Sequence, residues 1–282
     1  MSTALVRTDV PMPHDDSRET VRDVLTHFTA DDDRFLVELL QSQLNRTSDT
    51  ALQQGFDAHA AAPTPATRAT LDAEIERALA YLGSSDVAYA LREASGQTPG
   101  VSLDEVVDDA AKALGVAVPR RAMSFRRRVE AVAEAHAAKT LAGMTPEAQQ
   151  RFLEDAGVER QQAARFVKTA AGVFAFPALV AAFEALVVER LLRGVVFGTI
   201  AKLVGRRISG ALFGALLART PWWLRAIGPV SIALSVGWTL LDLAGPALRK
   251  TVPAVLYLGL VSHRARLASG EGEDPHDATA RV

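Results

Sequence analysis

Side chains that could act as acids, bases or metal ligands are scattered along this sequence. None of its six histidines forms an i, i+4 pair of the kind that zinc-binding helices carry. No nucleophile elbow, P-loop or strand-linked glycine fingerprint is present. We therefore expect no catalytic residue, no cofactor and no metal site, and we predict that the protein is not an enzyme.

Two acidic clusters could bind a cation, but each has a simpler explanation. Asp31–Asp33 follows Thr29 as the first turn of a helix would, where carboxylates are stabilised by the helix dipole. The cluster lacks the glycine turn and the glutamate at position 12 of a calcium loop. The second cluster lies at helical spacing after Ser102, and we expect a solvated helix face there. Its members are Asp104, Glu105, Asp108 and Asp109.

Five arginines lie within nine residues ahead of an alanine-rich helix. They could contact phosphates of lipid or nucleic acid. No aromatic residues are interleaved with them, so base stacking is not supported, and a net charge of −2 excludes a strongly basic nucleic-acid binder. We favour a basic helix terminus that meets the acidic face nearby. The residues are Arg120, Arg121, Arg126, Arg127 and Arg128.

The composition excludes several classes of protein. The chain has 282 residues, of which 49% are hydrophobic and 23% charged, which is enough for a substantial core. It has no cysteine, which rules out a disulfide scaffold, thiol catalysis, an iron–sulfur cluster and cysteine-based zinc sites. The mean hydropathy of +0.10 is high for a soluble enzyme.

Charge is strongly segregated along the chain. Residues 1–164 carry a net charge of −9, residues 165–267 carry +10 and residues 268–282 carry −3. Such asymmetry suggests an interaction surface on one part of the chain. The alternative is that two helical modules dock on each other partly through opposite charge.

The hydrophobic pattern predicts an all-α fold. Val21, Val24, Leu25 and Phe28 recur with the spacing of a helix face, and no strand-like alternation continues over five residues. A further apolar stripe ends at Gly83. Ser102 and the Thr145-Pro146 pair each have the signature of a helix start, and the helix that begins after Ser102 is expected to end near Leu114. We expect a multi-helix N-terminal module and an apolar, glycine-rich C-terminal helical hairpin or bundle.

We divide the chain into four parts. Residues 1–14 are expected to be a disordered N-terminus without a secretory signal, and residues 15–164 an acidic helical module with a linker at about 59–69. Residues 165–267 form a basic, apolar helical module that is a candidate for membrane activity. Residues 268–282 are an acidic tail that is expected to be disordered.

Two apolar segments, 169–188 and 226–248, have about the length of a membrane span, which requires roughly 20 apolar residues. Aromatic and basic residues flank the second segment as interfacial anchors do, and one acidic residue interrupts it. The anchors are Trp222, Trp223, Arg225, Arg249 and Lys250, and the acid is Asp242. Asp242 would mark a functional position inside a membrane, or would cap or pair inside a water-soluble bundle.

Small residues between the two segments would let helix backbones approach closely, in a membrane or in a tight soluble hairpin. Gly194, Gly198 and Gly205 lie near one helix face, and Gly210 and Gly214 form a second small-residue pair. The cations of this stretch mostly avoid the small face, and we regard them as candidates for lipid headgroup contacts. They are Arg190, Arg193, Lys202, Arg206 and Arg207.

The sequence closing this region is Gly245-Pro-Ala-Leu-Arg-Lys-Thr-Val-Pro-Ala-Val-Leu-Tyr257, preceded by Ile227-Gly-Pro229 and Trp238-Thr239. It resembles the C-terminal signature of the YaaW-like family of bacterial proteins, some of which are described as ubiquinol–cytochrome c chaperone-like. Weaker similarity lies at Asp31–Leu40, at Tyr81–Arg92 and at Leu114–Val116, so that the resemblance spans roughly residues 30–265. Leu248 and Lys250 depart from the pattern, which has an aromatic and an aliphatic residue there.

The resemblance implies a helical bacterial protein with an apolar C-terminal part, and it supplies no activity and no catalytic residues. From the residues themselves we expect a membrane-associated protein with a concealed hydrophobic hairpin, which would insert into membranes or form a pore. The alternative is a soluble adaptor or assembly chaperone that binds a partner helix. The expected partners are anionic membrane lipid or a protein, with homo-oligomers possible on membranes. We expect a cytoplasmic location or association with the inner membrane.

Overall fold

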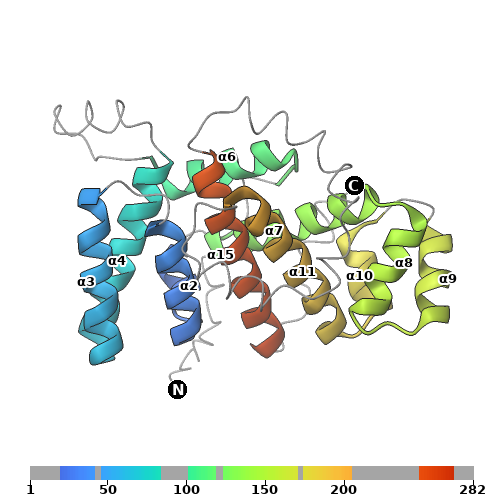
Figure 1. Cartoon of the computed structure of the whole chain (residues 1–282), viewed down its shortest axis with the longest axis horizontal. Coiled ribbons are helices and arrows are strands. Elements are labelled where there is room, and N and C mark those ends of the chain that lie inside the picture. Colours follow the sequence, from blue (N-terminus) through green and yellow to red (C-terminus); the bar gives the residue numbers. More distant parts are fainter. Residues whose placement is uncertain are drawn as a thin grey trace, which may run out of the picture.

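The computed structural model describes residues 20–41, 46–83, 101–118, 123–170, 174–204 and 248–269. Every regular element in these ranges is a helix, so the fold is all-α as the sequence predicts (Figure 1). The helices are α1 (Val21–Leu25), α2 (Ala30–Gln41), α3 (Arg46–Ala61), α4 (Pro65–Leu82), α6 (Leu103–Leu114), α7 (Phe125–Ala142), α8 (Pro146–Asp155), α9 (Arg160–Ala170), α10 (Phe176–Ala182), α11 (Ala185–Val204) and α15 (Leu248–Ser269).

The ends of several helices follow from local sequence. The Ser102 side chain accepts a hydrogen bond from the Glu105 amide and caps α6, which ends after Leu114 at Gly115 in the left-handed conformation. Thr145 caps α8 and Pro146 occupies its first turn. Gly83 ends α4. The boundaries expected at these positions are confirmed.

The break between α3 and α4 is shorter than the predicted linker at about 59–69. α3 continues to Ala61 and α4 begins at Pro65, which leaves residues 62–64 as the turn between two helices packed on each other. Alanine-rich flanks favour helix, while Thr64 and Pro65 are suited to a helix start, so the turn is confined to three residues.

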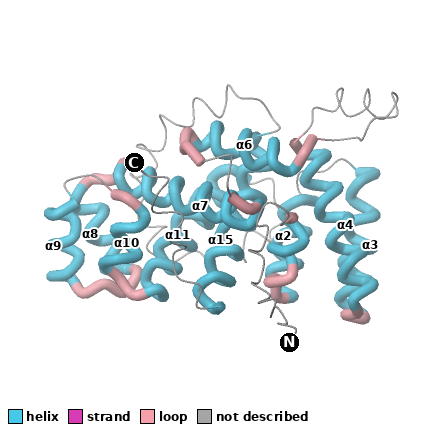
Figure 2. Tube along the Cα trace, turned by 180° about the vertical axis from the view of Figure 1, so that it is seen from behind, coloured by secondary structure: helices cyan, strands magenta, loops and turns pink. Residues whose placement is uncertain are grey.

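Helix α15 is the central element of the fold. It packs most extensively along α7 and also contacts α11, α6 and α2. Figures 1 and 2 show it in the middle of the molecule, with α3 and α4 at one end and α8, α9 and α10 at the other. Every residue from Thr251 to His263 is buried. A helix that is apolar around its whole circumference must be enclosed in this way to remove its side chains from water.

The two modules expected from the charge pattern share this core. The predicted boundary at 164/165 lies inside α9, and α15 packs directly on α7 and α2 of the N-terminal part. The buried apolar residues from both sides of that boundary form one cluster.

The apolar run at 169–188 is not a single helix. α9 ends at Ala170, α10 occupies Phe176–Ala182 and α11 begins at Ala185. Pro177 lies in the first turn of α10, and Phe183 is extended, which separates α10 from α11. Seven residues make α10 about 10 Å long. Among the described helices, none combines the length and the apolar character that crossing a membrane requires. The run at 226–248 lies outside the described residues up to Leu248, where α15 begins.

Gly259 permits the closest approach of α15 to α7. A Cβ atom placed on it would lie inside contact distance of the Val129 carbonyl oxygen and 2.8 Å from the Ala133 Cβ. Both neighbours belong to the rigid body of α7, so a side chain at position 259 can be accepted only if the two helices separate.

Gly259→Ala should therefore destabilise the protein by about 1–3 kcal/mol or more, as overpacking of a core does. The measurement is urea unfolding of the full chain. Gly55→Ala on α3 is the matched control, because a Cβ there would meet its nearest atoms at 3.6 Å. That control should be neutral or stabilising by up to about 1 kcal/mol. Equal stability of the two variants would contradict this account of the α7–α15 contact.

Candidate functional site

Asp32 anchors the C-terminal part of α15 to the start of α2. Its carboxylate accepts hydrogen bonds from the Tyr257 hydroxyl at 2.7 Å and from Arg264 Nη2 at 2.5 Å. It also caps its own helix by accepting bonds from the Thr29 hydroxyl at 2.6 Å and the Thr29 amide at 2.9 Å. The capped helix start predicted at Asp31–Asp33 is confirmed, and the same carboxylate additionally makes a long-range ion pair.

These contacts keep Asp32 ionised although it is 3% exposed. Burial by itself would raise the pKa of Asp32, but the hydrogen bonds from Arg264, Thr29 and Tyr257 outweigh burial and lower that pKa below its ordinary value. The neighbouring Asp33 is also buried and pairs with Arg68 of α4, with Nη1–Oδ2 at 2.8 Å. The start of α2 thus binds two arginines from distant parts of the chain.

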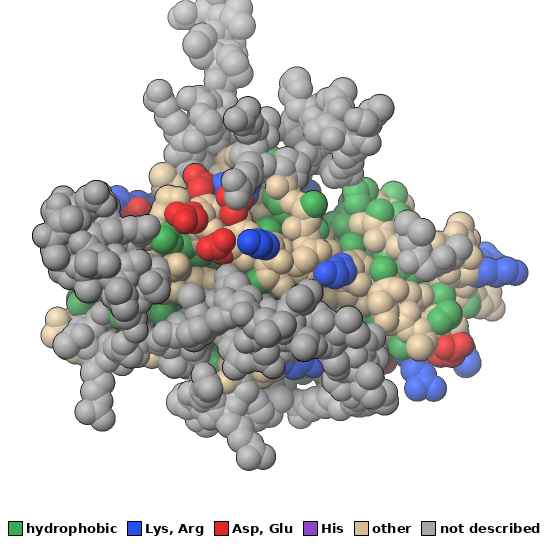
Figure 3. All heavy atoms as spheres, turned by 90° about the horizontal axis from the view of Figure 1, so that it is seen from above, with side chains coloured by type: hydrophobic (Ala, Val, Ile, Leu, Met, Phe, Trp, Pro, Cys, Tyr) green, Lys and Arg blue, Asp and Glu red, His purple; other side chains and the backbone are tan. Residues whose placement is uncertain are grey.

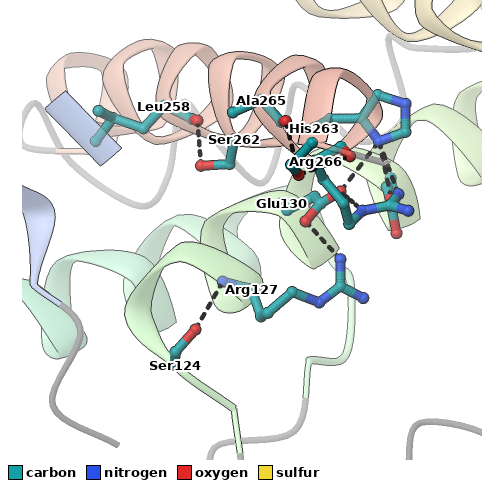
Figure 4. A network of polar contacts seen from close by, with 10 residues as sticks. Ser124, Arg127, Glu130, Leu258, Ser262, His263, Ala265 and Arg266 are labelled. Atoms are coloured by element: carbon teal, nitrogen blue, oxygen red, sulfur yellow. Dashed lines mark hydrogen bonds and ion pairs between the residues drawn. The ribbon is translucent and has the colours of Figure 1, made fainter. Parts of the chain in front are cut away.

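A second charged cluster joins α7 to α15 one turn beyond their apolar contact (Figure 4). Glu130 Oε1 lies 2.6 Å from Arg266 Nε and 3.1 Å from His263 Nδ1, and its other oxygen pairs with Arg127. Glu134 Oε1 lies 3.1 Å from the same histidine nitrogen and 3.2 Å from Arg266 Nη2. Glu130 and His263 are fully buried. The charge of each is therefore compensated by the other charged members of the cluster and not by water.

The cluster shifts the pKa values of its members in opposite directions. For Glu130, burial raises the pKa, but the hydrogen bond from His263 and the charges of Arg127 and Arg266 lower it to about 2. For His263, burial lowers the pKa, but the contacts with Glu130 and Glu134 raise it above the ordinary value. The ring of Phe176 from α10 packs edge-on against the imidazole, with centroids 5.6 Å apart.

Glu130, Glu134 and His263 present ligand atoms close enough together to hold a metal ion. The charges around them do not fit one. Arg266 contacts both carboxylates and lies 3.2 Å from the histidine nitrogen that would bind the ion, and Arg127 pairs with the remaining oxygen of Glu130. A divalent cation would have to displace two guanidinium groups that already neutralise the carboxylates. We conclude that this cluster is an ion-pair network.

Of the five arginines, Arg128 near the start of α7 meets the acidic face of α6, as the sequence predicts for the group, whereas Arg127 pairs with Glu130 of α7 itself. Arg128 is buried and pairs with Asp104 and with Asp108, the latter at 2.6 Å. Figure 3, which views the molecule from the side where α6 lies, shows acidic side chains gathered on this surface. Arg120 and Arg121 lie outside the described residues.

A pocket of about 200 Å³ lies between α2, α11 and α15. Asp32 and Glu189 are its buried carboxylates, and each is paired with a lining arginine, Arg264 and Arg193 respectively. A carboxylate paired with an arginine is a weak general base, and the hydrogen bonds from Arg264, Thr29 and Tyr257 lower the pKa of Asp32 further from the range that acid–base catalysis uses. The pocket therefore provides no acid–base pair among the described residues.

His136 is a second buried histidine with opposite surroundings. It lies on α7, is 5% exposed, and its Nε2 is 2.9 Å from the Thr199 hydroxyl of α11. Burial, together with the positive charges of Lys139 and Lys202, lowers its pKa to about 4. The imidazole is therefore neutral at pH 7.

Helices α11 and α15 run antiparallel. The charge of Glu189 on α11 acts on Arg264 of α15, and further along α11 the ring of Phe197 lies 6.1 Å from the ring of Tyr257. Residue numbers thus rise along one helix as they fall along the other. The C-terminal end of α11 at Val204 and the N-terminal end of α15 at Leu248 therefore lie at the same end of the pair.

The candidate membrane residues are distributed over this pair. Gly194 and Gly198 are buried within α11, which packs on α15 and α7. Arg193 pairs with Glu189, and Arg190 donates to the Ala156 carbonyl oxygen, so both are engaged within the molecule. Lys202 is exposed near the other end of α11, and Arg249 and Lys250 lie in the first turn of α15. The remaining candidates lie outside the described residues: Gly205, Arg206, Arg207, Gly210, Gly214, Trp222, Trp223, Arg225 and Asp242.

The charged clusters on α15 do not follow from the sequence pattern. His263, Arg264 and Arg266 are close in sequence, and Glu130 and Glu134 have i, i+4 spacing, but the two groups are about 130 residues apart. The one available signal was the run of polar residues that ends an otherwise apolar helix.

No family model, curated protein or solved structure matches this chain. The resemblance to the YaaW-like family therefore stays a prediction. The described residues assign no reaction to the protein, and its function has to be argued from the geometry.

Glu130→Gln should destabilise the protein by about 3–5 kcal/mol, because it leaves His263 and Arg266 buried without a full counter-charge. The measurement is the free energy of unfolding in urea. Glu74→Gln is the matched control, because Glu74 pairs with the half-exposed Arg77 at i, i+3 on a helix surface. That exposed pair should contribute less than about 1 kcal/mol. A loss below that value for Glu130→Gln would show that the network does not support the fold.

The raised pKa of His263 makes its contribution to stability depend on pH. The charged imidazole stabilises the fold fully below the unfolded pKa of about 6.5, and this contribution is lost as pH rises through the raised folded pKa. The stability difference between wild type and His263→Gln should therefore be largest near pH 6 and shrink toward pH 9, as measured by urea unfolding. A difference that grows with pH would contradict the assignment.

Proposed function

We propose that this protein associates with membranes through residues 205–247, the part of the sequence that connects α11 to α15. The observation that carries the proposal is the antiparallel packing of α11 on α15. Because Val204 and Leu248 lie at one end of this pair, the two points at which residues 205–247 are attached to the described helices lie at the same end of the body. They number about twice the ~20 residues that one membrane-spanning helix requires.

The apolar residues of the described helices support this assignment. They are taken up by a single core, and Val180 and Leu186 are the large apolar side chains that stand exposed within the described ranges. Two scattered residues do not make a membrane-binding surface. Contact with a bilayer would therefore depend on the segment between α11 and α15, whose sequence includes the Trp222-Trp223 pair.

The charge at this end of the helix pair favours an anionic surface. Lys202 is exposed near the end of α11, and the sequence continues with Arg206 and Arg207. The first turn of α15 contains Arg249 and Lys250 and no acidic residue. Cations at a helix N-terminus are disfavoured by the helix dipole, whereas anionic headgroups nearby would offset this cost and gain about 1 kcal/mol per basic residue.

Vesicle flotation tests the proposal. The wild-type chain should float with vesicles that contain phosphatidylglycerol and much less with pure phosphatidylcholine vesicles. Leu234→Asp with Val236→Asp, placed in the apolar run 226–241, should reduce flotation at least tenfold, because each charge costs about 2.5–3.5 kcal/mol in an inserted helix.

The headgroup contacts are tested separately by Lys202→Glu, Arg249→Glu and Lys250→Glu combined. The matched control reverses three cations on the exposed face of α9, Arg160, Arg165 and Lys168. The first triple should lose binding to anionic vesicles and the control should keep it. A wild-type chain that stays at the bottom of the gradient with either vesicle would refute membrane association, and leakage of a trapped dye distinguishes a pore from an anchor.

A second candidate function is that of an adaptor that holds a partner helix. It is favoured by an open groove of about 500 Å³ where α8 and α9 meet the end of α7. Met144, Ala164 and Val167 give it an apolar lining, with Lys168 and Glu147 among the other lining residues. Gel filtration without detergent separates the two functions, because an adaptor should elute as a single monodisperse species that does not bind vesicles.

A further inference from the structure

We infer that His136 is a proton-sensitive latch that holds α11 against α7 at neutral pH and releases it under mildly acidic conditions. The latch concerns the contact between two described helices. Its consequence for membranes, the freeing of the helix that leads into residues 205–247, rests on the function proposed above.

The contact depends on a neutral imidazole. His136 of α7 and Thr199 of α11 are 5% and 6% exposed, and the 2.9 Å contact between Nε2 and the threonine hydroxyl is made in the middle of the helix interface. The other ring nitrogen, Nδ1, is buried and has no hydrogen-bond partner among the described residues. A proton added there would be a buried donor and a buried charge without an acceptor.

The charges that act on His136 oppose protonation. Lys139 lies on the same helix, one turn further along, and Lys202 lies on α11. The Lys139 ammonium donates to the carbonyl oxygens of Leu114 and Gly115, so it is fixed in place. With burial, these charges lower the pKa of His136 to about 4, and among the described residues no carboxylate offsets them.

Several acidic groups on the other helices that pack against α7 have partners, and Glu105 and Asp109 of α6 are exposed and half-buried respectively. Asp104 and Asp108 of α6 bind Arg128, and α10 contains no charged residue. Glu130 and Glu134 of α7 face α15, where they bind His263 and Arg266, and Arg127 also pairs with Glu130. On α1, Asp23 binds the Thr20 amide and Arg22 pairs with Glu76 of α4.

The two buried histidines make the response selective. His263, between α7 and α15, lies against two carboxylates and has a raised pKa, so acidification to pH 5 leaves this contact charged and intact. His136, between α7 and α11, has a lowered pKa, so the contact it makes loses stability as pH falls from about 6.5 toward 4. Acid should loosen α11 while α15 stays bound.

The size of the effect follows from the pKa of His136. If an imidazole of ordinary pKa is formed when α11 detaches, the ratio of detached to bound α11 rises about 30-fold at pH 5 and approaches about 300-fold below pH 4. Detachment would expose Val195, Val196 and Ile200, which are buried in the bound state. These residues would extend the apolar surface of the segment that follows.

Hydrogen exchange of the full chain without lipid tests the latch. Protection factors, corrected for the intrinsic effect of pH, should fall by an order of magnitude or more for peptides of α11 between pH 7 and pH 5, and should change little for peptides of α15. His136→Gln should abolish the difference, because glutamine can still bond Thr199 and does not titrate. His27→Gln, at an exposed histidine, is the matched control and should respond as wild type does.

Equal protection of α11 at the two pH values in wild type, or an undiminished loss in His136→Gln, would overturn the inference. If the variant does not fold, an NMR titration of wild type decides, since a pKa of 6.5 or above for His136 would also overturn it. Vesicle flotation at both pH values separates the two proposals. Loosening of α11 without flotation would support the latch and refute membrane association. Flotation at both pH values without loosening of α11 would support membrane association and refute the latch.

Discussion

The burial of α15 is the constraint on which the rest of the structure depends. Its residues from Thr251 to His263 are enclosed by α7, α11, α6 and α2, yet the helix ends in a cluster of cations. Charges that leave water must be paired, so the neighbouring helices supply carboxylates at this end. Asp32 binds Arg264, and Glu130 with Glu134 binds His263 and Arg266. Acidic residues of the N-terminal part thus dock on basic residues of the C-terminal part.

This docking explains part of the charge segregation. The sequence left open whether the basic C-terminal part is an interaction surface or the complement of the acidic part. In the described residues, Arg264 and Arg266 are neutralised across that boundary, and Arg193 is neutralised within α11. Arg165 and Lys168 are exposed separately on α9, while Lys202, Arg206, Arg207, Arg249 and Lys250 gather in sequence around the end of α11 and the start of α15. The antiparallel packing of these helices places both ends together, which is why the membrane proposal concentrates on that end of the pair.

The contacts that α7 makes with α15 and with α11 differ in how they respond to added positive charge. Toward α15, the backbone at Gly259 lies close to the Val129 carbonyl and the Ala133 side chain, and the ion-pair network of Glu130, His263 and Arg266 follows one turn later. Toward α11, the central polar contact is a single neutral histidine bonded to a threonine, with two lysines as the nearest charges. Positive charge added to the first interface meets carboxylates, whereas among the described residues positive charge added at His136 meets the lysines Lys139 and Lys202. The contact of α7 with α15 is therefore expected to persist at acidic pH, whereas the contact of α7 with α11 is expected to weaken when His136 is protonated.

Local sequence was sufficient for the helices. Capping residues such as Ser102 and Thr145, stop signals such as Gly83, and the apolar spacing within each helix act over a few residues, so the all-α fold and many boundaries could be predicted. The linker predicted at about 59–69 is confined to residues 62–64, because its alanine-rich flanks are helical. The apolar run 169–188 is continuous in hydropathy, but Pro177 and the extended Phe183 divide it between separate helices.

The charged site was decided only by the tertiary structure. Asp32 lies in the first turn of a helix that begins after Thr29, as predicted, and also binds Tyr257 and Arg264, more than 220 residues away, which no local pattern records. His136 and His263 are the same type of residue, but the pKa of His136 is lowered and that of His263 is raised. The difference arises from the groups that the tertiary structure packs against each ring. The sequence by itself determined which helices form and which faces are apolar, because those depend on neighbours along the chain. Which charges are paired, and which end of α11 meets which end of α15, depend on neighbours in space.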